Sequence, residues 1–187
     1  MSLQGIDDVN SQFNRELELL IKGELSKGHV FYLGDMSDVL SAIGVKILPI
    51  EMQANRLFRK SKQDNHQLEL STLKDLPLWL NNPIMVFNSK TVAGSLVVLT
   101  EMISNSHNFV AAIEIEKTVT EWTKGQIKIN SVRSIYPKDT ITDVLNWIEK
   151  DEILLWANKK KTLDLLVRWR SNYANATQQI KRFNSKL

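Results

Sequence analysis

Cysteine is absent from this chain of 187 residues, which excludes disulfide bonds and thiolate metal sites and suits a reducing cytoplasm. No run of about eighteen apolar residues occurs, so no segment is expected to span a membrane. The phosphate loops GxGxxG and GxxxxGKS/T are missing, as are the HExxH and GxSxG motifs. We therefore expect a cytoplasmic protein without metal or cofactor. An NTPase, a dinucleotide enzyme, a zincin or an α/β-hydrolase is therefore not expected.

The formal net charge of +3 is spread unevenly along the chain. Residues 150–187 hold nine Lys or Arg and three Asp or Glu, a net +6, so residues 1–149 total −3. A basic terminal segment attracts polyanions such as RNA. It is equally typical of a solvated helix with lysines toward its C-terminal end, where the helix dipole favours them.

Helical spacing and turn residues predict mostly short elements before residue 83. Ser37 or Asp35 is the expected N-cap of one helix, and Gly44 its left-handed end. Pro77 is expected to kink or restart another helix. The predicted elements are a helix over Asp7–Lys22, a strand in HVFYLG (29–34), a helix in SDVLSAIG (37–44), an extended ILPIEM (47–52), a helix over Ala54–Lys62 and a helix in STLKDLPLWLNN (71–82).

Four segments rich in Val, Ile and Phe follow, and each is predicted to be a strand. The turns between them are short, which favours an antiparallel meander. In a regular strand Ser134 and Tyr136 would point opposite to Arg133 and Ile135. The segments are IMVFNS (84–89), SLVVLTEM (95–102), NFVAAIEI (108–115) and QIKINSVRSIYP (126–137).

The chain is expected to end in helices, over residues 139–158 and 160–183. In the second helix Leu166, Trp169 and Tyr173 begin a heptad-like seam, which either packs on its own domain or mediates self-association or binds a partner helix. The fold class is therefore α+β: N-terminal helices, a four-stranded antiparallel β-meander, and C-terminal helices packed on the sheet. The expected division is an N-terminal helix (1–28), an α+β domain (29–157) and a basic C-terminal helix (158–187).

The stretch NSVRSIYPKD (130–139) concentrates cationic and phenolic groups at a strand end. Metal-independent RNA cleavage needs a base, an acid and cations near the phosphorane, and such groups can supply them. His66, in the polar stretch SKQDNHQLEL (61–70), titrates near neutrality and is a candidate base or acid. The structural alternative places the Tyr136 ring in the core and leaves the cations on the surface.

Two carboxylates on neighbouring predicted strands, Glu101 and Glu114, form a second candidate for general base chemistry. The alternative for them is pairing with Lys128 or Arg133. That alternative is the more common arrangement on a sheet surface.

The order HVFYLG, ILPIEM, NHQLELSTLKDLPLWLNNPIMVF, SLVVLTEM, NFVAAIEI and INSVRSIYPKD resembles the MuF-associated C-terminal domains of phage and mobile-element proteins. These relatives include the phage branch of the Barnase–EndoU–colicin–RelE (BECR) superfamily. The resemblance covers roughly residues 29–157. It implies helices on a four-stranded antiparallel sheet and a metal-independent RNA-cutting toxin or effector. The residues it carries over are His66, Arg133, Ser134, Tyr136 and Lys138.

Two functions follow as hypotheses. In the first, a ribonuclease-like domain uses His66, Arg133, Tyr136 and Lys138 as catalytic residues, while phosphate contacts Asn130, Arg133, Ser134 and Lys138. In the second, a non-catalytic module binds a partner or itself through Leu166, Trp169 and Tyr173.

Overall fold

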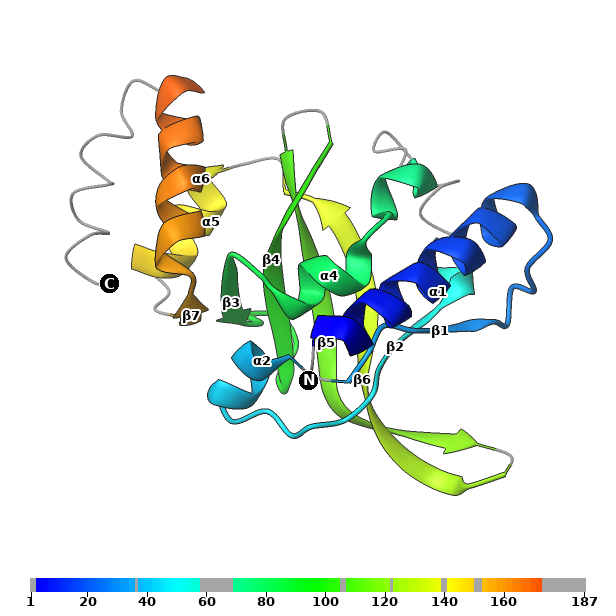
Figure 1. Cartoon of the computed structure of the whole chain (residues 1–187). Helices are drawn as coiled ribbons and strands as arrows, with labels where there is room; N and C mark the ends of the chain where they lie inside the picture. Colours follow the sequence, from blue (N-terminus) through cyan, green and yellow to red (C-terminus); the bar gives the residue numbers. More distant parts are fainter. Residues whose placement is uncertain are drawn as a thin grey trace.

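The computed structural model describes residues 3–35, 37–57, 69–104, 107–121, 123–138, 141–149 and 153–172. Within them one mixed sheet of seven strands is flanked by helices, with the strand order β1-β2-β6-β5-β4-β3-β7 (Figure 1). The α+β class is confirmed. The strands are β1 (Val30–Tyr32), β2 (Ile50–Gln53), β3 (Met85–Asn88), β4 (Ser95–Ser104), β5 (His107–Glu121), β6 (Gly125–Pro137) and β7 (Leu154–Ala157). The helices are α1 (Leu3–Lys22), α2 (Asp38–Ala42), η1 (Leu70–Leu73), α4 (Leu76–Asn81), α5 (Ile141–Glu149) and α6 (Lys159–Asn172).

The four predicted strands are present as β3 to β6, and each pairs antiparallel with the next. The predicted four-stranded sheet is nevertheless too small, because three further strands join its edges. On one edge β2 pairs parallel with β6 and antiparallel with β1. On the other edge β7 pairs antiparallel with β3, where helix was expected throughout residues 139–158. A short apolar run suits a buried strand or a helix equally, and the available backbone partner decides between them.

One face of the sheet is covered by α1, α2 and α4, and α1 and α4 lie in front of it in Figure 1. The apolar stripe of α1 buries Phe13, Leu17 and Leu20 almost completely, and the Phe13 ring meets Phe31 of β1 edge-on at 5.3 Å. Burial of such side chains is the main contribution to the stability of this layer. We call this layer the first core; its sheet residues include Met52, Val86, Val98, Ala111, Ile113, Val132 and Ile135.

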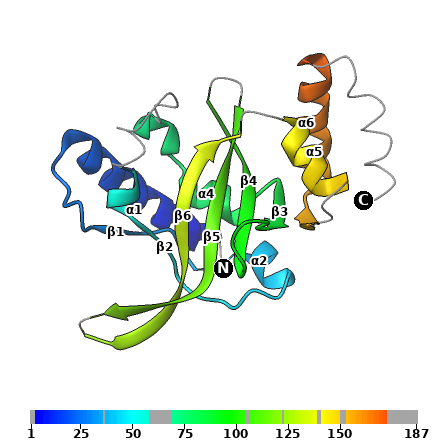
Figure 2. The ribbon, with the colours of Figure 1, turned by 180° about the vertical axis from the view of Figure 1, so that it is seen from behind.

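The opposite face is covered by helices at one side alone. There α5 and α6 pack over β3 and neighbouring strands, with Val144, Leu145, Leu165 and Leu166 in the buried cluster that we call the second core. Seen from behind, α5 and α6 stand beside the sheet, and no helix lies across β5 and β6 (Figure 2). Among the described residues, the β5–β6 part of this face is therefore left without a helical cover. We call it the uncovered face.

Local signals in the sequence set several element ends. Ser37 is the N-cap of α2, where its Oγ accepts a hydrogen bond from Leu40 N, and Gly44 follows α2 with a φ of +86°. Pro77 restarts the chain as helix α4, in whose first turn it lies, after the separate turn η1. The helix predicted over Ala54–Lys62 is seen for residues 54–57, and its remainder lies outside the described residues.

Candidate functional site

A β-bulge in β6 turns Arg133 toward the uncovered face. Ser134 pairs with Ala112 and Val132 with Ile113, so Arg133 is the extra residue between them. A bulge places an additional side chain beside its neighbour instead of on the opposite side. The expected alternation, in which Arg133 and Ser134 point apart, is therefore wrong at this position.

The uncovered face holds a carboxylate between two cations. Glu114 Oε2 lies 3.3 Å from Lys117 Nζ and 3.9 Å from Arg133 Nε. The three side chains are 31%, 29% and 46% exposed respectively, so all of them are open to solvent. We call these three residues the Glu114 cluster. A carboxylate with adjacent cations can take a proton while the cations stabilise an anion, which is the chemistry that phosphodiester cleavage needs.

Two serines flank the cluster on the neighbouring strands. Ser95 of β4 and Ser131 of β6 both pair with Glu114 across the sheet. Each is 5% exposed. The Oγ of Ser95 is buried and has no hydrogen-bond partner within the described residues. A buried hydroxyl without a hydrogen-bond partner, as at Ser95, is uncommon in folded proteins.

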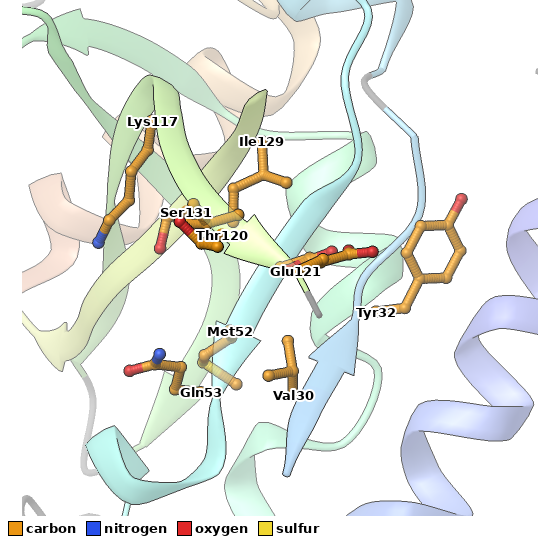
Figure 3. Close-up of a pocket in the computed structure, with 11 residues that line it drawn as sticks. Val30, Tyr32, Met52, Gln53, Lys117, Thr120, Glu121, Ile129 and Ser131 are labelled. Carbon is orange, nitrogen blue, oxygen red and sulfur yellow. The ribbon is translucent and has the colours of Figure 1, made fainter. Parts of the chain in front are cut away.

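A pocket of about 320 Å³ opens beside the cluster, between β1 and β2 on one side and the end of the β5–β6 hairpin on the other (Figure 3). Burial raises the pKa of Glu51 above its ordinary value of 4.5, and the nearby Glu121 carboxylate raises it further against the opposing effect of Lys124. Burial also raises the pKa of Tyr32 to about 12, helped by the hydrogen bond that its hydroxyl donates to Asp35. The lining residues are Val30, Tyr32, Glu51, Met52, Gln53, Lys117, Val119, Thr120, Glu121, Ile129 and Ser131.

Of the residues predicted from the sequence, Arg133 and Ser134 lie on the uncovered face near Glu114. Lys138 lies elsewhere: its Nζ is 2.6 Å from Asp143 of α5 and 4.9 Å from the centre of the Trp147 ring. Tyr136 packs against the second core. Arg133 and Lys138 therefore contact different carboxylates, Glu114 on the uncovered face and Asp143 of α5.

Two further predicted residues do not line this face. Asn130 is fully buried; its Oδ1 accepts from Glu116 N at 3.1 Å and its Nδ2 donates to Lys46 O at 3.4 Å. A phosphate contact from Asn130 would require these bonds to break. His66 lies outside the described residues, so its role stays a prediction.

The seam predicted through Leu166, Trp169 and Tyr173 is described in part. Leu166 is 2% exposed in the second core, so at this residue α6 packs on its own domain. Tyr173 and the side chain of Trp169 lie outside what the structure describes.

A scan against protein-family models matches residues 58–164, more than half of the chain, to the phage MuF C-terminal domain. The chain belongs to this family. Searches of the curated proteins and of the solved structures gave no match. Within the described residues, no helix combines the length and apolar character that crossing a membrane requires.

The MuF C-terminal domain match contains β3 to β6, α5 and β7, and therefore all three residues of the Glu114 cluster. The strands β1 and β2 precede the matched range. Glu51 and Tyr32 thus bring a second wall to the pocket from outside the segment that defines the MuF C-terminal domain.

Lys117, Glu51 and Glu121 were not singled out by the sequence. Lys117 joins the cluster because a second irregularity, between Glu114 and Lys117, changes the pairing of β5 with β6. No pattern in a single sequence marks such a bulge, although the alternation of apolar and polar residues ends after Ile115. Glu114 was considered with Glu101, but Glu101 lies 2.6 Å from Lys161 of α6 instead. The alternative pairing of Glu114 with Arg133 is the one observed.

Proposed function

We propose that this MuF C-terminal domain is a metal-independent ribonuclease of phage or mobile-element origin, of the toxin or effector type, that acts on its uncovered face. The observation that carries the proposal is the Glu114 carboxylate between Lys117 and Arg133 on that face. Placement in the BECR superfamily is part of the proposal. A mixed sheet with helices packed over one face, and with exposed charged groups on the β5–β6 part of the other, supports it.

The reaction assigned to the cluster is transesterification within RNA. Glu114 takes the proton of a ribose 2′-hydroxyl, and the 2′-oxygen attacks the adjacent phosphorus. Arg133 and Lys117 stabilise the negative charge that grows on the phosphorane oxygens, and Ser134 lies beside them to contact phosphate. The bond from phosphorus to the 5′-oxygen then breaks, and that oxygen takes a proton. The products are a 2′,3′-cyclic phosphate and a free 5′-hydroxyl.

His66 is the residue that we assign to protonate the leaving 5′-oxygen, because a histidine changes its charge near neutral pH. Tyr136 and Lys138, predicted as catalytic, serve in this proposal to fix the end of β6 against α5, as the Lys138–Asp143 ion pair indicates. Asn130 serves to fix the start of the same strand segment.

The test is incubation of the purified chain with total RNA in excess chelator. We expect cleavage that produces 2′,3′-cyclic phosphate ends and that spares a 2′-deoxy substrate. Glu114→Gln and Arg133→Ala should each slow cleavage about 100-fold or more, in the range of general acid–base and electrostatic contributions. His66→Ala should slow it as well.

Two surface variants serve as matched controls. Glu18→Gln and Arg15→Ala change exposed residues of α1, which covers the opposite face, and should leave the rate unchanged. Because a contaminating ribonuclease would cleave equally in every preparation, the Glu114→Gln protein also controls for contamination. Intact RNA at high protein concentration would contradict the proposal, as would equal rates for Glu114→Gln and the wild type.

A further inference from the structure

The pocket beside the Glu114 cluster has the shape of a small-ligand site. Its volume of about 320 Å³ lies at the lower end of the range for such sites, about 300–1,000 Å³. Val30 and Met52 come from the β1–β2 side and Ile129 from the hairpin, so apolar walls stand on both sides (Figure 3). A flat aromatic group fits between apolar walls of this kind.

Two of the polar side chains in the pocket, those of Glu51 and Glu121, are hydrogen-bond acceptors when ionised, and Tyr32, Gln53, Thr120 and Ser131 can both donate and accept. Burial, together with the nearby Glu121 carboxylate, raises the pKa of Glu51, and Lys124 Nζ lies 3.2 Å from Glu121 Oε2. Ser131 also lines the pocket and is 5% exposed, and its hydroxyl can accept or donate a hydrogen bond. A ligand that brings N–H donors to these groups would replace lost solvation.

The pocket is continuous with the Glu114 cluster. Lys117 lines the pocket and also contacts Glu114, and Ser131 lines it while pairing with Glu114 across the sheet. In Figure 3 the Lys117 and Ser131 side chains lie on the same side of the pocket. A ligand here would therefore meet acceptors at one end and, through Lys117 and Arg133, cations at the other.

We propose that this pocket binds the base of an RNA nucleotide whose phosphate lies at the Glu114 cluster, and that it prefers guanine. A nucleotide carries N–H donors on its base and an anion on its phosphate, which matches the two ends of the site. Guanine presents two adjacent donors, N1–H and the N2 amino group, which one carboxylate can accept together. Uracil, cytosine and adenine lack such a pair of adjacent donors on this edge, so an acceptor of the base would face one oxygen of the carboxylate and be repelled.

A protein side chain is the competing ligand, because arginine also offers paired N–H donors to a carboxylate. The site disfavours it, since Lys117 lines the pocket and Arg133 lies next to it. An incoming cation would be repelled by both, whereas a phosphate is attracted.

The inference rests on the proposed function for the position of the phosphate, but base binding can be measured without cleavage. Titration calorimetry with the four nucleoside 3′-monophosphates should show the guanosine form binding at least tenfold more tightly than the others. Glu51→Gln should weaken that binding at least tenfold, because the amide offers a donor where the base needs an acceptor. Glu121→Gln should weaken it as well, and Glu18→Gln, an exposed glutamate of α1, should not.

The outcomes separate the two proposals. Binding of guanosine 3′-monophosphate by a chain that does not cut RNA would overturn the ribonuclease proposal and retain the pocket. Cleavage without base preference, with equal binding of all four nucleotides, would overturn the pocket alone. Binding of an arginine-containing peptide in place of any nucleotide would also overturn it. Circular dichroism of the Glu51→Gln protein checks that lost binding does not come from lost structure.

Discussion

Asn130 lies where β2 meets β6, and its side chain connects three parts of the backbone. The backbone of Asn130 pairs with Ile50 of β2. Its fully buried side chain accepts a hydrogen bond from Glu116 N and donates one to Lys46 O. A buried amide that bonds backbone groups holds them at fixed positions. At the scale of the residue, this side chain sets the geometry of the hairpin that carries the Glu114 cluster.

We expect Asn130→Ala to lower the free energy of unfolding by about 1–3 kcal/mol, because the Glu116 N–H and Lys46 carbonyl lose their partner. Urea denaturation followed by circular dichroism measures this change. Asn88→Ala, at an exposed end of β3, is the control and should shift stability by less than about 0.5 kcal/mol. Equal stability of Asn130→Ala and the wild type would show that these bonds contribute little.

The sequence predicted Asn130 as a phosphate ligand because a polar residue on a strand suggests a function. Its burial depends on the parallel contact with Ile50, which no local pattern reveals. Arg133 and Ser134 were named from the same stretch and do lie near Glu114, because the bulge turns both toward the uncovered face. Residue type thus named two side chains that lie on the uncovered face and one that a distant segment buries, and the roles of all three stay predictions.

At the scale of the element, β5 and β6 form a hairpin whose pairing is interrupted twice. At the second interruption Glu116 has a φ of +51°, a left-handed conformation that is strained for a residue with a side chain. Its carboxylate accepts hydrogen bonds from Lys46 at 2.7 Å and Lys128 at 3.0 Å. These bonds hold the irregular turn of the strand against the segment that precedes β2.

The Glu116 contacts make part of the stability depend on pH. Hydrogen bonds from Lys46 and Lys128 lower the pKa of Glu116 below its ordinary value of 4.5. Because the folded pKa is the lower one, the stabilisation is present above pH 4.5 and is lost as the pH falls through the folded value. We expect Glu116→Gln to lower the urea midpoint near neutral pH and to match the wild type at a pH below the folded value.

Glu18→Gln provides a comparison for this effect, since Glu18 of α1 is 53% exposed and lies 3.5 Å from the exposed Lys74, which follows η1. An exposed pair of this kind contributes little, so its removal should leave the urea midpoint nearly unchanged at both pH values. A difference between Glu116→Gln and the wild type that is equal at both pH values would show that the charge of Glu116 is not the cause.

Elements were predicted well where the residue types act locally. The runs of Val, Ile and Phe gave β3 to β6, Ser37 marked the start of α2, and Pro77 the restart at α4. The helix predicted for the residues of β7 was wrong. Their apolar side chains suit a helix or a strand, and β3 supplied the backbone partner that a strand needs. Bulges escaped prediction because a single extra residue in one strand has meaning only once the opposite strand is known.

At the scale of the whole molecule, two buried clusters stand on opposite faces of one sheet. The first core covers one face broadly, and the second core lies on the side of β3, α5 and α6. That α5 and α6 stop short of β5 and β6 was not predicted, since the packing of helices on a sheet depends on their whole arrangement. The predicted division into 1–28, 29–157 and 158–187 stays a prediction.

A substitution at Leu166 tests how much α6 contributes to the second core. It is 2% exposed, so Leu166→Ala should lower the free energy of unfolding by about 2–5 kcal/mol through lost burial and a cavity. Val167→Ala, at a neighbouring residue that is 65% exposed, should change it by less than about 0.5 kcal/mol. Light scattering of Trp169→Glu examines the alternative of self-association, which would be contradicted by a monomer in both wild type and variant.

The parallel contact between β2 and β6 joins Ile50 to Asn130, which are 80 positions apart in the chain. During synthesis on the ribosome, β1 and β2 emerge long before the strand that they join, and an isolated pair of strands is at best marginally stable. Tyr32 and Glu51, which form one wall of the pocket, therefore reach their final places after β6 has been made. A nascent chain interrupted before that moment would hold neither the pocket nor the Arg133 that completes the Glu114 cluster.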